Sequence, residues 1–225
     1  MTQPRPHLRP RVTAQQLALE HIRGLISSGA MRPDDHIRQE QLAAELGTSV
    51  VPVREALKTL EAEGQVTYIP HRGFQVTRLS LQELQETYEI RRLLEDEVVR
   101  IAGPRLTDRH FDGLEAAMGA MEDAGRARDV PAMIAANHDF HFTVFEAADR
   151  PRMVEFIRLL WQSTDAYRTL YYSEAGARRR VDDEHRAIVS ALREGRVGDA
   201  IRLLEEHRQH AVADLATRFE VGAGS

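Results

Sequence analysis

Apolar residues recur at helical spacing in three short stretches near the N-terminus, and a pair of strand-like runs follows them. The spacing predicts helices over 13–29, 38–46 and 49–63 and a hairpin over 66–78. Gly47 separates the second helix from the third, because glycine readily takes the left-handed backbone that ends a helix. Ser49 is placed to cap the third helix. This order of elements predicts a winged helix-turn-helix.

The third of these helices turns a set of side chains away from its apolar stripe. The outward positions are Ser49, Val50, Arg54 and Lys58, and the hairpin tip carries His71, Arg72 and Gly73. An outward Ser and Arg on a helix, followed by a basic hairpin tip, is typical of proteins that read the DNA major groove with a wing beside it. We therefore expect these seven residues to contact double-stranded DNA.

Amphipathic helical stretches fill the remainder of the chain. They are expected over 80–102, 107–127, 130–148, 151–173, 177–194 and 197–219. Short connections marked by Gly and Pro imply an antiparallel six-helix bundle, so the expected fold is mainly α. The expected layout is a disordered basic arm over 1–12, the winged helix-turn-helix over 13–78, an all-helical domain over 79–220 and a disordered tail over 221–225.

The formal net charge of −5 is divided unevenly along the chain. Residues 1–78 carry ten Lys and Arg against eight Asp and Glu, whereas residues 79–225 carry twenty against twenty-seven. The positive excess thus coincides with the predicted DNA-binding part. The chain has no cysteine and no apolar run of membrane-spanning length, so we expect a cytoplasmic protein that contacts no membrane.

Three histidines fall on or beside the apolar stripes of three different helices. At 100° per residue, His141 lies in the middle of its stripe, with Asn137 one turn earlier on the same face. His185 is also central, whereas His207 lies at the edge of its stripe. A single buried histidine is more often hydrogen-bonded to a backbone carbonyl, but three inward imidazoles suit a divalent transition metal such as Zn, Ni or Mn. The spacing alone supports both interpretations equally.

Arg91 occupies the centre of the apolar stripe of the helix over 80–102. A guanidinium group in an apolar interior is costly unless it is paired. Glu95, one turn further on, is one candidate partner. A ligand carboxylate, which the planar fork can bind bidentately, is the other. Both are compatible if Glu95 holds Arg91 in place.

Short motifs in both halves of the chain identify a family resemblance. They are S-x-x-P-V-R-E-A-L at 49–57, E-G-x-V at 63–66, R-G-F-x-V at 72–76, R-x-x-L-E at 91–95, N-x-x-F-H at 137–141, E-H at 184–185, and G-D followed by H at 198–207. In this order and at these separations they resemble the GntR family of bacterial transcription regulators. The resemblance is to the FadR-type branch, which carries an FCD ligand-binding domain.

The resemblance implies a homodimer that binds a palindromic operator and a helical domain that binds a small carboxylate effector, often through a divalent metal. In this chain the metal ligands would be Asn137, His141, His185 and His207, with Arg91 and Asn137 facing the effector. One departure from the family is at the recognition helix, where Val50 and Val51 replace an Arg and a Thr. A missing arginine removes a contact to guanine worth about 1–3 kcal/mol, so we expect a different half-site or weaker binding.

The expected function is a ligand-responsive transcriptional regulator, most often a repressor in such families, and not an enzyme. The alternative is a metal-dependent enzyme that uses the three-histidine site, because three histidines with open positions also describe a catalytic metal. The helix phases place Asp183 and Glu184 to the side of the buried face that carries His185, so no general base is expected there. We therefore favour the regulator.

Overall fold

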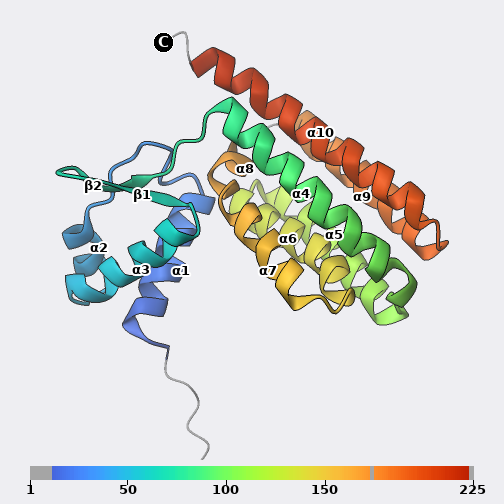
Figure 1. Ribbon diagram of the computed structural model, residues 1–225, viewed down its shortest axis with the longest axis horizontal. Coiled ribbons are helices and arrows are strands. Elements are labelled where there is room, and N and C mark those ends of the chain that lie inside the picture. The colour runs from blue at the N-terminus through green and yellow to red at the C-terminus, as the bar shows by residue number, and fades with distance from the viewer. Residues whose placement is uncertain (1–11, 173–174, 223–225) are drawn as a thin grey trace, which may run out of the picture.

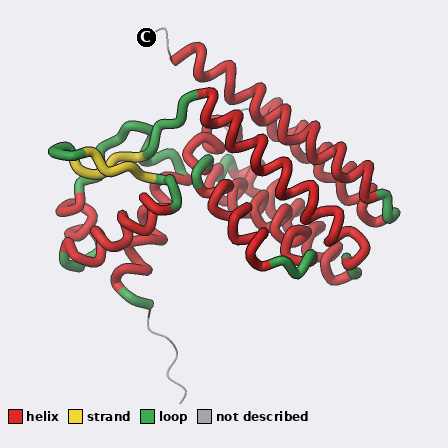
Figure 2. Tube along the Cα trace, in the orientation of Figure 1, coloured by secondary structure: helices red, strands yellow, loops and turns green. Residues whose placement is uncertain are grey.

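The computed structural model describes residues 12–172 and 175–222, which form a small winged domain next to a long bundle of helices (Figure 1). Figure 2 shows that, within these ranges, strand is confined to the wing. The mainly α fold with a winged helix-turn-helix and a helical bundle is therefore confirmed. The expected arm over 1–12 and tail over 221–225 lie largely outside the described residues.

The winged domain consists of α1 (Ala14–Ser27), α2 (Gln39–Glu45), α3 (Val50–Ala62), β1 (Val66–Ile69) and β2 (Gly73–Val76). Thr13 begins α1 through a capping box with Gln16, which satisfies backbone N–H groups that no helical turn can reach. Gly47, with a φ of +61°, takes the left-handed backbone that the sequence predicted after α2. Ser49 stands at the N-cap position of α3, but its side chain makes no capping hydrogen bond.

The wing is an antiparallel hairpin, in which Val66 pairs with Val76 and Ile69 with Gly73. The backbone of residues 34–37 hydrogen-bonds to β2 and covers that edge of the small sheet. Gly73 has a φ of +85°, a conformation that glycine adopts at no steric cost. The hairpin tip is therefore held in a tight, defined turn.

The bundle comprises α4 (Leu81–Ala102), the 3₁₀ turn η1 (Gly103–Arg105), α5 (Asp108–Ala127), α6 (Val130–Ala147), α7 (Pro151–Gln162), α8 (Asp165–Tyr172), α9 (Ala175–Arg193) and α10 (Val197–Gly222). Ser80 begins α4 through a capping box with Glu83. In Figure 1 the long helices α4 and α10 lie side by side, and α5 packs against α6. Among the described helices, none combines the length and the apolar composition needed to cross a membrane.

The helix expected over 151–173 is interrupted and forms two helices, α7 and α8. Ser163 and Thr164 lie at the break, and their hydroxyl groups donate to the carbonyls of Leu160 at 2.9 Å and Trp161 at 3.0 Å. Hydroxyl side chains that bond helix carbonyls compete with the regular backbone ladder. The apolar spacing continues across the break, which is why the periodicity did not predict it.

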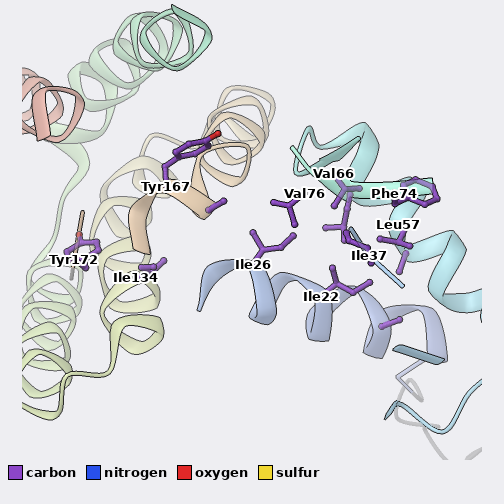
Figure 3. Packing of buried hydrophobic residues seen from close by; sticks show 14 of the residues in the cluster. Ile22, Ile26, Ile37, Leu57, Val66, Phe74, Val76, Ile134, Tyr167 and Tyr172 are labelled. Atoms are coloured by element: carbon purple, nitrogen blue, oxygen red, sulfur yellow. The ribbon is translucent and has the colours of Figure 1, made fainter. Parts of the chain in front are cut away.

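The hydrophobic core of the winged domain continues into the bundle. Figure 3 shows α1 residues Ile22 and Ile26 facing the wing, with Ile134 and Tyr167 on the bundle side of the same cluster. The hydroxyl of Tyr167 accepts a hydrogen bond of 2.6 Å from the backbone N–H of Leu79, in the segment between β2 and α4. The short helix α8 is thus attached to the connection between the two parts.

Candidate functional site

The outer surface of α3 and the wing tip carry most of the residues expected to contact DNA. Ser49, Arg54, Lys58, His71 and Arg72 are exposed, and Gly73 is half-buried. Arg54 Nε donates to Gln39 Oε1 at 3.3 Å, and the ammonium group of Lys58 lies 3.0 Å from Glu55. Exposed contacts of this kind contribute little to the stability of the fold and are easily broken. Both cations therefore remain available to bind phosphates and base edges.

The structure corrects the outward position expected for Val50. Val50 is half-buried and packs against the core of the winged domain, whereas Val51 is 67% exposed. The reason is helical phase, because seven residues at 100° each bring Val50 to within about 20° of the buried Leu57. Val51, rather than Val50, is therefore the apolar side chain that α3 presents on its surface.

Three imidazoles from three helices meet inside the bundle. His141 belongs to α6, His185 to α9 and His207 to α10, and their ring centroids are 5.0–5.3 Å apart. One nitrogen of each ring lies within 4.8 Å of the others. Nitrogen ligands of one tetrahedral zinc ion are about 3.4 Å apart, so small side-chain rotations would bring these rings to a common ion. All three residues are buried, with exposed fractions of 3%, 0% and 8%.

Several polar atoms in this cluster have no hydrogen-bond partner among the described residues. They are Nε2 of His141, both ring nitrogens of His185 and Oδ1 of Asn137. An unpaired buried polar group costs about 1–3 kcal/mol, so several such groups in one place indicate that something outside the chain binds there. Nitrogen donors with one amide oxygen suit a divalent transition metal. The residues present therefore fit a metal ion.

Glu184 of α9 holds His207 from outside the cluster. Its two carboxylate oxygens accept hydrogen bonds from Nδ1 of His207 at 2.6 Å and from Nδ1 of His210 at 2.7 Å. A proton on Nδ1 leaves the lone pair of His207 on Nε2, which is the tautomer that a metal ligand needs. Burial alone would raise the pKa of Glu184, but the hydrogen bonds and charges of the two histidines hold that pKa below its ordinary value.

The electrostatics favour uncharged imidazoles at two of these histidines, His141 and His185. Burial lowers the pKa of His141 well below its ordinary value, and the neighbouring His185 and His207 lower it further. Burial likewise lowers the pKa of His185, with a contribution from His207. A neutral imidazole keeps a lone pair for a metal ion, whereas a protonated one does not.

A buried ionic network adjoins the histidines. Glu95 of α4 is 1% exposed and accepts hydrogen bonds from Nε of Arg91 at 2.8 Å, from Trp161 at 2.7 Å and from Arg208 of α10 at 2.9 Å. Of the two partners considered for Arg91 from the sequence, the structure thus provides Glu95. The guanidinium of Arg91 also lies over the rings of Tyr88 and Trp161, at 4.5 and 4.3 Å from their centroids.

A cavity of about 30 Å³ lies between the network and the histidines. Its lining residues include Arg91, Asn137, Arg168, His207 and Arg208. Arginine side chains and two members of the proposed metal site therefore face one small space. Such a combination of positive charge and polar donors suits a small anion.

Two residues that the structure places in this candidate site, Glu184 and Arg208, were not predicted as site residues from the sequence. Glu184 was placed at the side of the helix that carries His185, because a helical phase says nothing of contacts with another helix. Arg208 is different, since it lies within about 40° of Leu204 and about 20° of Leu215 on α10, both buried. The phase test that singled out His141 would therefore also have placed Arg208 on the buried stripe.

Comparison with known families and proteins agrees with this architecture. Residues 14–76 match the model of the gntR family of bacterial regulatory proteins, and residues 86–210 match the FCD domain. The Nta operon transcriptional regulator of Aminobacter aminovorans is 27% identical over 79% of this chain and 83% of its own length. The HTH-type transcriptional regulator McbR of Escherichia coli is 29% identical over 60% of this chain and 62% of its own length.

Solved structures show the same fold. The E. coli McbR/YncC structure has a TM-score of 0.83 at 24% identity and covers 93% of this chain and all of that chain. A GntR regulator from Rhodococcus sp. RHA1 has a TM-score of 0.76 at 23% identity, over 90% of this chain and 97% of that chain. The chain belongs to the GntR family of bacterial regulatory proteins, with an FCD domain after its winged helix-turn-helix, and is a DNA-binding transcriptional regulator.

Proposed function

We propose that this regulator is controlled by a small carboxylate effector, which binds in the FCD bundle beside a divalent transition metal. The winged helix-turn-helix over 13–78 would bind the operator, and the helical domain over 79–220 would bind the effector and form a homodimer on a palindromic site. Repression in the cytoplasm is the expected mode of action. The observation that carries the proposal is the convergence of three buried imidazoles, three of whose six ring nitrogens have no hydrogen-bond partner among the described residues.

The side chains divide the work of holding a metal. His141, His185 and His207 would supply the nitrogen ligands, Asn137 would supply an oxygen, and Glu184 would orient His207. A bound divalent cation supplies a positive charge to which a carboxylate oxygen can bind. Because the three imidazoles are buried among aromatic rings such as Phe140 and Trp161, water is largely excluded from this position.

The proposed response travels from the bundle to the winged domain. The cavity is small, so an effector that enters it has to displace its walls, and one of those walls is α8. Tyr167 of α8 is hydrogen-bonded to Leu79, which precedes α4. A movement of α8 would therefore change how the winged domain is held, and with it the separation of the two recognition helices in a dimer. Coupling of this kind is usually about 1–3 kcal/mol.

The enzyme alternative is less well supported by the geometry. Glu184 is an acidic group that contacts a proposed metal ligand directly, and both of its carboxylate oxygens already accept hydrogen bonds from histidine rings. That arrangement suits a residue that positions a ligand better than one that takes a proton from water.

The metal is tested by elemental analysis of purified protein. Wild type and His141→Ala are compared after expression in the same metal-supplemented medium, with His110→Ala as the control. His110 belongs to the capping box that begins α5 and is not part of the cluster. We expect about one equivalent of metal per chain in wild type and in the control, and a clear loss in His141→Ala. Equal metal contents in all three would refute the site.

A further inference from the structure

Arg168 of α8 is a buried cation whose two terminal nitrogens make no hydrogen bond among the described residues. The residue is 5% exposed, and its guanidinium lies 3.9 Å from the centroid of the Trp161 ring. Nη1 is 3.3 Å from Oδ1 of Asp165, yet neither terminal nitrogen makes a hydrogen bond to any residue in the described ranges. Burying a guanidinium without its hydrogen bonds is costly. The fork is therefore arranged for an anion that is not part of the chain.

The other two guanidinium groups of the cavity differ from Arg168. Arg91 and Arg208 both donate to Glu95, and Arg208 is also hydrogen-bonded to Asp96 and Glu205. The chain itself thus compensates these two charges. The family resemblance assigned the effector carboxylate to Arg91, but the structure gives Arg91 a hydrogen-bonded internal partner. The terminal nitrogens of Arg168 have only the 3.3 Å contact of Nη1 with Asp165 and no hydrogen bond within the described ranges.

Arg168 faces the same small cavity as the proposed metal centre. His207 and Asn137 line this space together with Arg168. A carboxylate placed there would be within the same small space as the guanidinium group of Arg168 and two of the proposed metal ligands. A volume of about 30 Å³ accommodates roughly two water molecules, so even a small carboxylate enters only as the walls separate.

We propose that Arg168, rather than Arg91, is the residue that binds the effector carboxylate, and that it passes the effect of binding to the winged domain through α8. This inference rests on the proposed function and makes it more specific. Arg168 also lines a second cavity, of about 290 Å³, which α1 shares with α6 and α8. Its neighbour in sequence, Tyr167, holds the backbone of Leu79. A shift of Arg168 toward a ligand therefore moves a helix that contacts both the winged domain and the connection to it.

The test uses the full-length protein loaded with Zn²⁺ and three probes: acetate, malonate and succinate. Binding is measured by isothermal titration calorimetry. We expect Arg168→Gln to keep the zinc content of wild type but to bind the best of these probes about tenfold more weakly or worse, because charge-assisted hydrogen bonds to the carboxylate are lost. Arg168→Lys keeps the positive charge but lacks the planar guanidinium group, so its affinity for the probe should lie between those of wild type and Arg168→Gln.

A second measurement separates binding from a structural role. Without a probe, Arg168→Gln should unfold at about the same temperature as wild type or at a higher one, because the guanidinium makes no hydrogen bond through its terminal nitrogens and its ionic contact with Asp165 is long, at 3.3 Å, and partly exposed. A residue that only supports the fold would lower the unfolding temperature. The matched control is Arg158→Gln on α7, whose guanidinium also lies over an aromatic ring, that of Phe142, outside the cavity. The control should bind the probes as wild type does.

The outcomes distinguish this inference from the proposed function. Equal probe affinity in wild type and Arg168→Gln, or a lower unfolding temperature of unliganded Arg168→Gln, would overturn the role of Arg168 while the effector site stands. If wild-type protein bound none of the three carboxylates, the proposed effector class would fail, and the inference with it. Weaker binding in Arg168→Gln, with unchanged zinc content and unchanged or higher thermal stability, supports both.

Discussion

Replacing Glu95 by glutamine tests whether the buried ionic network stabilises the bundle. Burial alone would raise the pKa of Glu95, but Arg91 and Arg208, together with hydrogen bonds from Arg91 and Trp161, hold that pKa below its ordinary value. The side chain is therefore an anion at neutral pH, and Glu95→Gln removes one negative charge without changing its shape. Because Oε1 accepts from Arg91 and Trp161 and Oε2 from Arg208, the new amide group must point its N–H donors at a guanidinium.

The expected loss of stability in Glu95→Gln depends on the acidic partners that Arg91 and Arg208 retain. Removing one partner of a buried ion pair costs about 3–5 kcal/mol. Arg208 retains Asp96 at 2.6 Å and Glu205 at 3.1 Å, so most of the loss falls on Arg91 and the lower end of that range applies. In a protein of this size, about 3 kcal/mol corresponds to a fall in unfolding temperature of about 6–12 °C.

The assay is thermal unfolding of chelator-treated protein, followed by circular dichroism, with urea unfolding as a second measure. Glu97→Gln on the same helix is the control, because Glu97 pairs with Arg100 at the surface, where both side chains are about half exposed. We expect this control to change stability by less than about 1 kcal/mol. The double variant Glu95→Gln with Arg91→Met should recover part of the loss, since it removes the cation that lost its partner. A Glu95→Gln protein as stable as the control would refute the reasoning.

Three further predictions concern DNA binding, metal affinity and coupling. Arg54→Ala, which removes an exposed cation of α3, should abolish specific operator binding in an anisotropy titration. Its unfolding temperature should stay within about 1 °C of wild type, because the side chain is exposed. Retained specific affinity would contradict the assignment of the recognition helix. Glu184→Gln should weaken zinc binding about 10–100-fold in a competition assay with a chromogenic chelator, because His207 loses its carboxylate partner; unchanged affinity would mean that this hydrogen bond does not orient a ligand. Tyr167→Phe leaves the N–H of Leu79 without its partner and should cost about 1–3 kcal/mol of stability. The same variant should bind metal normally but respond less to a carboxylate in its operator affinity, and an undiminished response would argue against transmission through α8.

The sequence was most informative where a single helix or hairpin determines the outcome. The left-handed backbone of Gly47 and the buried position of His141 each follow from the local pattern, and the structure has them as predicted. The prediction for Val50 was wrong, although the separation of about 20° between Val50 and Leu57 follows from the spacing within one helix.

Contacts between residues of two different helices could not be predicted from the sequence in the same way. The hydrogen bond from His207 to Glu184 crosses from α10 to α9, and the contacts of Glu95 with Trp161 and Arg208 join α4 to α7 and α10. Periodicity gives the face on which a residue lies but not the neighbour that meets it. The unpaired nitrogens of Arg168 depend on all of these placements together, so only the folded chain reveals them.

The interruption between α7 and α8 has a consequence for the shape of the pocket. Trp161 and Arg168 are seven residues apart, which in an unbroken helix is about 10.5 Å along the axis. Both side chains would then lean toward the same end, and the guanidinium would remain far from the indole. Their 3.9 Å stacking exists because Ser163 and Thr164 stop the helix from propagating. The break at Ser163 and Thr164 thus places Arg168 against Trp161 in the wall of the cavity, and we expect a chain with alanine at both positions to continue the helix and lose this contact.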